Sequence, residues 1–136
     1  MSLAAVLPAM ATAPERSRTF LAASAVVVVI GNLLAVVTPL VADPPRAFVG
    51  SIVTSGLLGL VFTLRTLQLF RRNGAVPVPA TTLSTVFGVW FMAAPLLYDT
   101  DTVGFLATAG TQLAGLLVAA FATYLLVHGL TATATE

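Results

Sequence analysis

The chain has 136 residues, of which 58% are hydrophobic and only 8% are charged, and its formal net charge is +1. A soluble domain carries about 25% charged residues, so the six basic and five acidic side chains are too few to cover a water-exposed fold. The small net charge argues against a nucleic-acid partner, and the absence of cysteine excludes disulfides, thiolate catalysis and cysteine-ligated metal sites. The composition predicts an integral membrane protein.

Residues 1–19 form a short lead ahead of the first long apolar run. The apolar part of the lead is interrupted by Pro8 and is much shorter than the roughly 20 residues that a spanning helix needs. No basic residue precedes that part, so we do not expect a cleaved signal peptide. We interpret 1–19 as a flexible or interfacial segment in which Arg16 and Arg18 mark the membrane boundary.

Residues 20–70 are predicted to form a first transmembrane hairpin, with spans at 20–41 and 47–70. The first span has no charged residue, one amide at Asn32, and Pro39 in its last turn. A proline there removes one backbone hydrogen bond and leaves a carbonyl without its partner. The prolines of the connecting turn prevent the first helix from continuing.

Residues 71–79 are the only predicted linker, and they separate the first hairpin from a second one at 80–128. The third span, 80–98, has Trp90 near its middle and Pro95 in its last turn. The position of Pro95 repeats that of the proline in the first span, so we expect the two hairpins to have the same construction.

A tight turn that contains Asp99 and Asp101 connects the third span to the fourth, which is predicted at 102–127. His128 and Gly129 close the fourth span, because glycine commonly ends a helix. We expect residues 129–136 to be a disordered tail.

The arginines predict the orientation in the membrane. Positive residues accumulate in cytoplasmic loops when the loops are short, and those flanking the first span and the central linker outnumber those on the other side. Both termini and the linker are therefore expected in the cytoplasm. Arg65 lies within the second span, but it is near enough to the end for its guanidinium to reach the headgroups. The arginines on the cytoplasmic side are Arg16, Arg18, Arg65, Arg71 and Arg72, and only Arg46 lies opposite.

An internal repeat appears when the chain is shifted by 56 residues, because Pro39 then falls on Pro95 and Asp43 on Asp99. The second and fourth spans also share a row of small residues at every fourth position, which places the row on one helix face. Small residues let helices approach closely in lipid, so we expect these rows to pack on each other or on a second protomer. The rows are Ser51, Ser55, Gly59 and Thr63, and Ala107, Thr111, Gly115 and Ala119.

Gly88, Trp90 and Pro95 resemble the SPW-repeat membrane proteins, whose repeat reads roughly G-x-W-L-x-x-S-P-W on the first of two spanning helices. Ala94 stands where that motif has serine, and the first half of the chain matches less closely, around Pro39. The resemblance covers a two-helix repeat present twice. It implies a small four-helix membrane protein and no established chemistry.

The three turn aspartates are candidates for an outer polar site. Asp99 and Asp101 share one turn and Asp43 occupies the equivalent turn of the first hairpin. Aspartate is favoured in turns for capping and Asx hydrogen bonds, and this interpretation is preferred. The alternative is a small acidic mouth on the outer face that binds protons or cations.

The remaining polar residues are predicted to have structural roles. Asn32 and Gln112 are expected to form hydrogen bonds between helices. Trp90 is expected to pack, with its indole N–H bonded to a hydroxyl or amide of a neighbouring helix; Thr38, Asn32 and Ser84 are candidates. His128 is placed to complement a helix dipole. Contact of His128 and Trp90 with haem or quinone is the alternative.

We therefore predict an all-α membrane protein of four spans, built as two tandem hairpins, in the plasma membrane of a prokaryote. The leading functional hypothesis is a non-enzymatic scaffold or accessory subunit, without cofactor, metal or catalytic residues, whose partners are the lipid bilayer and other membrane helices in a homo-oligomer or a larger complex. The alternatives are a small oligomeric transporter or channel, and a haem- or quinone-associated anchor of a respiratory complex.

Overall fold

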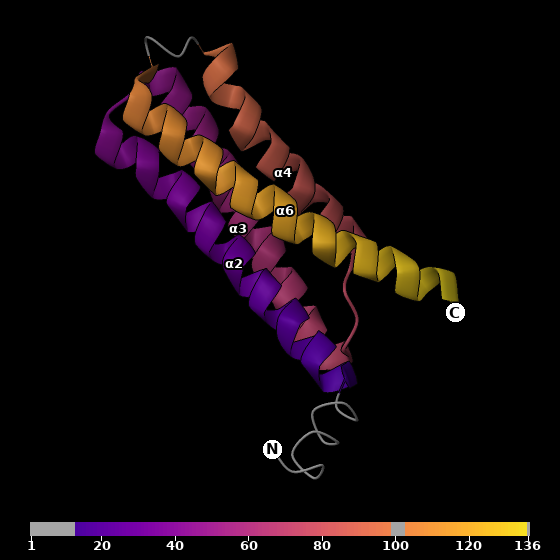
Figure 1. Ribbon diagram of the computed structural model, residues 1–136. Coiled ribbons are helices and arrows are strands. Elements are labelled where there is room, and N and C mark those ends of the chain that lie inside the picture. The colour runs from indigo at the N-terminus through magenta and orange to yellow at the C-terminus, as the bar shows by residue number, and fades with distance from the viewer. Residues whose placement is uncertain (1–12, 99–102, 136) are drawn as a thin grey trace, which may run out of the picture.

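The computed structural model describes residues 13–98 and 103–135, with side chains from 18 to 98 and from 103 to 131, and the described chain is all helical. Each of the four helices contains a segment long and apolar enough to cross a membrane (Figure 1). The predicted fold class is confirmed, and the chain is a multi-pass membrane protein. The helices are α2 (Ala13–Ala42), α3 (Arg46–Asn73), α4 (Val78–Leu97) and α6 (Phe105–Thr135).

The turn from α2 to α3 depends on Asp43 and the two prolines that follow it. Asp43 has a left-handed backbone with φ of 54°, a conformation that aspartate tolerates better than most residues. Its N–H donates to the carbonyl oxygen of Pro39 at 3.2 Å, which closes the last turn of α2. Pro45 then directly precedes α3. The turn role predicted for Asp43 is thus carried by its backbone.

The linker from α3 to α4 is shorter than predicted, because α3 continues through Asn73 and α4 begins at Val78. Gly74 ends α3 in the left-handed region with φ of 68°, and its N–H donates to the carbonyl oxygen of Phe70 at 2.8 Å. Glycine adopts this conformation without steric cost. A proline at position 77 precedes α4.

Both ends of the bundle are more helical than the sequence predicted. α2 begins at Ala13, so residues 13–19 of the expected lead belong to it. Pro14 is compatible with this start, since first-turn N–H groups have no helical partner. The disordered tail predicted at 129–136 is wrong for 129–135, which continue α6. Gly129 is buried, and a Cβ there would lie 3.2 Å from the carbonyl oxygen of Val76. It allows α6 to approach the linker instead of ending the helix.

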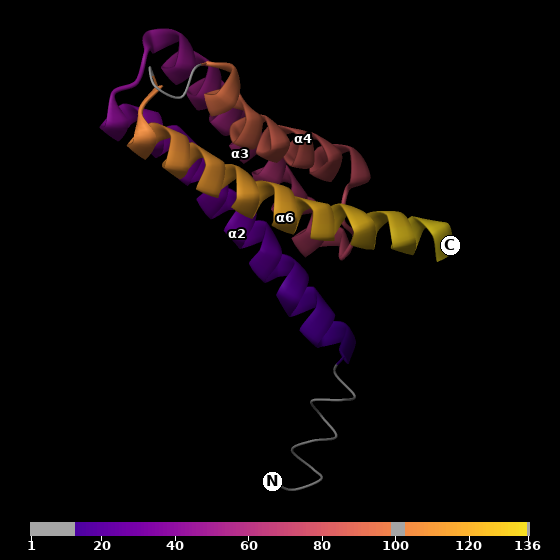
Figure 2. The ribbon, with the colours of Figure 1, turned by 45° about the horizontal axis from the view of Figure 1, so that its top comes forward.

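The four helices form a closed ring in which α2 packs on α3, α3 on α4, α4 on α6, and α6 on α2. Two views show α2 and α6 side by side, with α6 diverging from α2 toward its C-terminal end (Figures 1 and 2). The α2–α3 turn lies at one end of the bundle, and the α3–α4 linker lies at the other, near the beginning of α2 (Figure 1). The described chain is thus two hairpins in tandem.

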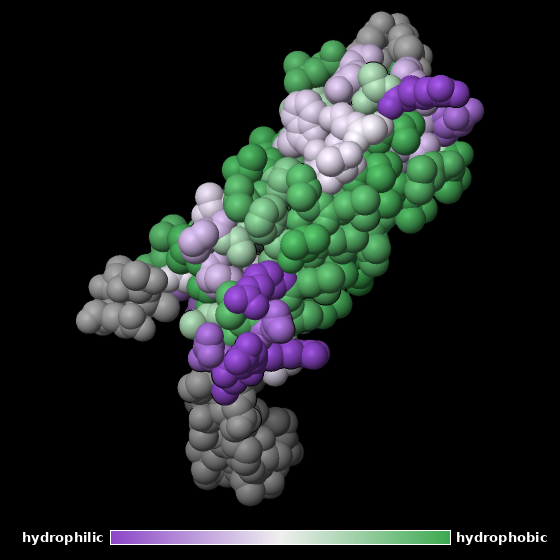
Figure 3. Space-filling model, turned by 180° about the vertical axis from the view of Figure 1, so that it is seen from behind, coloured by the Kyte–Doolittle hydropathy of each residue, from purple (hydrophilic) through white to green (hydrophobic). Residues whose placement is uncertain are grey.

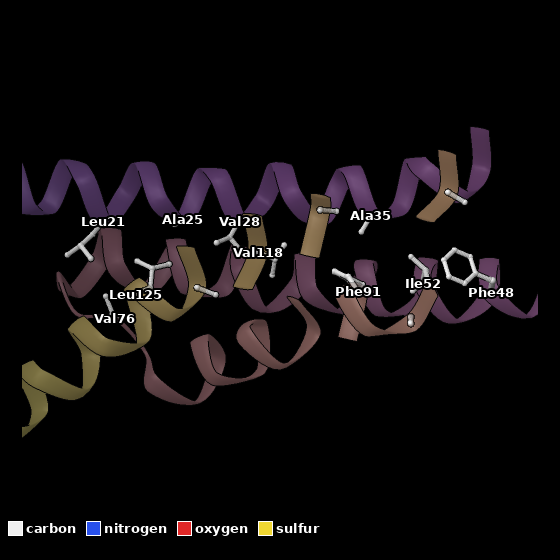
Figure 4. Close-up of a cluster of buried hydrophobic side chains, with 14 of the residues drawn as sticks. Leu21, Ala25, Val28, Ala35, Phe48, Ile52, Val76, Phe91, Val118 and Leu125 are labelled. Atoms are coloured by element: carbon white, nitrogen blue, oxygen red, sulfur yellow. The ribbon is translucent and has the colours of Figure 1, made fainter. Parts of the chain in front are cut away.

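The core is a row of apolar side chains along the middle of the ring. Figure 4 shows Leu21, Ala25, Val28 and Ala35 of α2 along one side of this row. Large apolar side chains point outward from every helix, and the outer surface is a broad hydrophobic belt between two polar ends (Figure 3). The belt is the surface that a bilayer would cover. The larger buried apolar residues are Leu21, Val28, Phe48, Ile52, Phe70, Val76, Phe91, Val103, Val118 and Leu125.

Candidate functional site

A buried polar cluster joins three of the four helices. Asn32 of α2 donates from Nδ2 to Thr63 Oγ1 of α3 at 3.3 Å, and also to the carbonyl oxygen of Val28 at 2.9 Å. Thr63 donates to the carbonyl oxygen of Gly59 at 2.7 Å. Its hydroxyl hydrogen is thus occupied, so Ser84 of α4 is the donor in the 3.5 Å contact with Thr63. The prediction that Asn32 bonds between helices is confirmed.

The interior contains no ionisable side chain among the buried residues that the structure describes. Three buried polar atoms, Asn32 Oδ1, Thr108 Oγ1 and Thr111 Oγ1, have no hydrogen-bond partner within the described chain. Buried amide and hydroxyl groups form hydrogen bonds that fix the positions of helices relative to one another. They neither gain nor lose a proton near neutral pH. The cluster therefore has the chemistry of a structural network.

The backbones of α4 and α6 approach each other closely at two glycines. A Cβ at Gly88 would lie 2.5 Å from the backbone nitrogen of Ala119, and a Cβ at Gly115 would lie 2.7 Å from the carbonyl oxygen of Gly88. Real Cβ atoms do not come this close to backbone. The motif glycine of the third span and the row glycine of the fourth span therefore form one backbone contact, and only glycine fits at either position.

The predicted internal repeat extends to this packing. Gly59 faces Asn32 in the first hairpin, and Gly115 faces Gly88 in the second. A shift of 56 residues carries Asn32 to Gly88 and Gly59 to Gly115. The two contacts thus occupy equivalent positions in the two hairpins. The first hairpin has the Asn32 amide at the place where the second has the backbone of Gly88.

The two rows of small residues do not pack on each other. α3 and α6 lie across the ring, and the row glycines face the preceding helix of their own hairpins. The row of α3 also changes environment along its length, since Ser51 and Ser55 are half-buried whereas Gly59 and Thr63 are buried. Each step of four residues turns about 40° beyond a full turn, so the row drifts from the rim to the interior. In α6, Ala107, Thr111 and Gly115 are buried and Ala119 is half-buried against Gly88.

An open apolar groove of about 700 Å³ runs between α4 and α6 on the outer face. Gln112 is its one amide and donates from Nε2 to the carbonyl oxygen of Met92 at 3.3 Å, which confirms its predicted bond between helices. The amide oxygen of Gln112 accepts no hydrogen bond within the described chain. The groove is lined by Val89, Met92, Ala93, Leu96, Gln112, Leu113 and Leu116.

The other predicted site residues are dispersed. Asp43 is exposed at the α2–α3 turn, whereas Asp99 and Asp101 lie outside the described residues, so the outer polar site stays a prediction. Pro39 and Pro95 are buried inside the last turns of α2 and α4, as predicted.

The aromatic and histidine candidates do not form a common site in the described structure. Trp90 is half-buried against the core. Its three candidate partners bond elsewhere, since Thr38 donates to the carbonyl oxygen of Leu34 at 2.6 Å and the other two belong to the polar cluster. His128 is half-buried on α6. No group of three potential metal ligands occurs among the described residues.

The chain matches no protein-family model, no curated protein and no solved structure. The resemblance to the SPW-repeat proteins therefore stays a prediction.

Sequence reasoning missed the contact of Gly88 with Gly115 and the place of Ser84 in the polar cluster. Ser84 and Gly88 are four residues apart, as are the small residues of the rows in the other spans. A pair of small residues at this spacing indicates a close helix contact in lipid and was the signal available for α4.

Replacing Gly88 by alanine is expected to destabilise the bundle by about 1–3 kcal/mol, because the new Cβ would overlap the backbone of α6. Gly50→Ala is the matched control, since a Cβ at Gly50 meets no atom within 4 Å. Unfolding in SDS mixed micelles, followed by circular dichroism, measures both. Equal stability of the two variants would contradict the backbone contact.

Thr63→Val is expected to lower the free energy of unfolding by about 1 kcal/mol, because it removes the hydroxyl that joins three helices. The control is Thr66→Val, since Thr66 is buried but bonds only to Phe62 in its own helix, at 2.9 Å. The same micelle titration compares them. A cost at Thr66 as large as that at Thr63 would show that the network between helices adds nothing.

Proposed function

We propose that the protein is a non-enzymatic membrane scaffold that works through helix packing, and that it self-associates through the groove between α4 and α6. The observation that carries this proposal is an incompletely bonded amide on the lipid-facing surface. Gln112 lies in an otherwise apolar groove at the side of the bundle, in the second turn of α6.

The amide of Gln112 is costly in a bilayer without a further partner. One of its N–H groups makes a long bond to Met92, at 3.3 Å, which leaves its other N–H and its oxygen available. Lipid tails provide no hydrogen-bond partner, so a polar side chain that faces them favours association with another helix.

A second copy of the chain satisfies this amide directly. In a two-fold dimer the same surface is used by both protomers, and an axis along the membrane normal places both Gln112 side chains at one depth. Because an amide is both donor and acceptor, each Gln112 gives a hydrogen bond to the other. The apolar residues of the groove then pack around this pair.

The distribution of arginines supports an orientation of the scaffold in the membrane. Arg18, Arg71 and Arg72 lie near the end of the bundle that holds the α3–α4 linker, and Arg46 lies at the other. The positive-inside rule supports a plasma-membrane protein with both termini in the cytoplasm. A prokaryotic source and membership of the SPW-repeat family are part of the same proposal.

Cysteine cross-linking tests the interface in a chain that has no natural cysteine. Leu113 lines the groove and is 53% exposed, whereas Val61 is 61% exposed on α3, away from it. Under oxidant in membranes, Leu113→Cys is expected to form a covalent dimer and Val61→Cys to remain monomeric. Cross-linking of both to the same extent would indicate random collision and contradict the proposal.

Gln112→Leu tests the amide pair itself. Polar contacts between membrane helices contribute about 0.6–1.7 kcal/mol, so we expect the dimer association constant to fall roughly 3- to 20-fold. Energy transfer between labelled protomers in vesicles measures this constant. An unchanged or higher constant would show that the groove associates by apolar packing alone or that another surface is used.

A further inference from the structure

A basic hollow of about 460 Å³ lies on the last turns of α3. Arg71 and Arg72 form its rim, and Leu64 and Leu67 supply apolar wall, with Gln68 between them. The hollow therefore combines two positive charges with an apolar surface over less than three helical turns.

The length of α3 places this hollow at the boundary between lipid and water. The helix has 28 residues and is about 42 Å long, whereas the hydrocarbon core of a bilayer is about 30 Å thick. Arg65 donates from Nη1 to Gln68 Oε1 at 3.1 Å, so its guanidinium reaches toward the C-terminal end of the helix. The leucines then face acyl chains while the arginines reach the headgroup layer.

Among the side chains that the structure describes, from 18 to 98 and from 103 to 131, the only acid is Asp43, and the side chain of Glu15 in the first turn of α2 lies outside these ranges. Residues 44–98 contain no aspartate or glutamate, and Asp43 lies at the opposite end of the bundle (Figure 1). Arg18 adds to the charge, since its guanidinium lies 3.7 Å from where a Cβ on Gly74 would be. In the space-filling view, hydrophilic residues gather at this end, next to the hydrophobic belt (Figure 3).

We propose that this hollow binds an anionic phospholipid, with Arg71 and Arg72 on the headgroup phosphate and one acyl chain along Leu64 and Leu67. Arginine matches phosphate geometry through paired N–H donors, and basic residues next to a spanning helix attract anionic lipid. The dipole of α3 explains arginines in the last turn, but it requires neither the leucine wall nor the additional charges of Arg18 and Arg65.

The test uses the full chain in a neutral detergent and counts bound lipid by native mass spectrometry, with phosphatidylglycerol and phosphatidylcholine as probes. Phosphatidylglycerol is expected to bind more tightly. The double variant Arg71→Gln, Arg72→Gln is expected to lose on the order of tenfold in affinity for it. Arg46→Gln, which removes a charge at the other end of α3, is the matched control and is expected to bind as the unchanged chain does.

Two further arms keep the result interpretable. Arg71→Lys with Arg72→Lys keeps the charge but lacks the paired N–H donors, so its affinity is expected to lie between that of the unchanged chain and that of the glutamine variant. Circular dichroism of the glutamine variant excludes simple loss of fold. Inorganic phosphate at matched ionic strength is expected to leave the lipid bound. Equal affinity for the two lipids, equal loss in Arg46→Gln, or displacement by inorganic phosphate would overturn the proposal.

Discussion

Backbone contact between α4 and α6 at Gly88 and Gly115 is the constraint on which the rest of the bundle depends. Lipid removes the hydrophobic drive for helix association, so helices must gain their stability from close packing and from hydrogen bonds. Two glycines facing each other allow the backbones to meet. α2 uses the same principle against α6, where a Cβ at Gly31 would lie 2.7 Å from a methyl group of Val118. Because α6 packs on both α4 and α2, the four helices close into a ring, and the buried apolar side chains of α2 contact those of the other helices.

The two hairpins use different chemistry at the same position. The second has glycine on glycine, whereas the first has Asn32 over Gly59 and extends its bond through Thr63 to Ser84 of α4. The hydroxyl of Thr63 therefore ties the first hairpin to the second through Ser84, in addition to the packing of α2 on α6. Beside the close contact of α4 and α6 lies the groove that contains Gln112, whose amide oxygen accepts no hydrogen bond within the described chain. The packing that closes the ring thus leaves the surface that we propose for self-association.

The spans, the hairpins and the proline positions were predictable because lipid requires long apolar helices with few breaks. The helix against which each row of small residues packs was not predictable. Rows at every fourth residue predict close contact, but they do not say which helix is met, and the α3 row drifts from Ser51 at the rim to Thr63 in the interior. Gly129 shows the same limit, since glycine both ends helices and permits contact, and only the neighbouring Val76 decides between these roles. The sequence marked Gln112 as polar, but its place in a groove depends on the ring order.

Subunit counting in liposomes tests the central claim most directly. The full chain, labelled with one fluorophore and reconstituted at low density in a neutral bilayer, would be bleached one molecule at a time. If α4 and α6 form the surface of a two-fold scaffold, most spots bleach in two steps at densities where random pairing is rare. A population that bleaches in single steps would show that the closed ring is complete as a monomer, and it would contradict self-association as the basis of function.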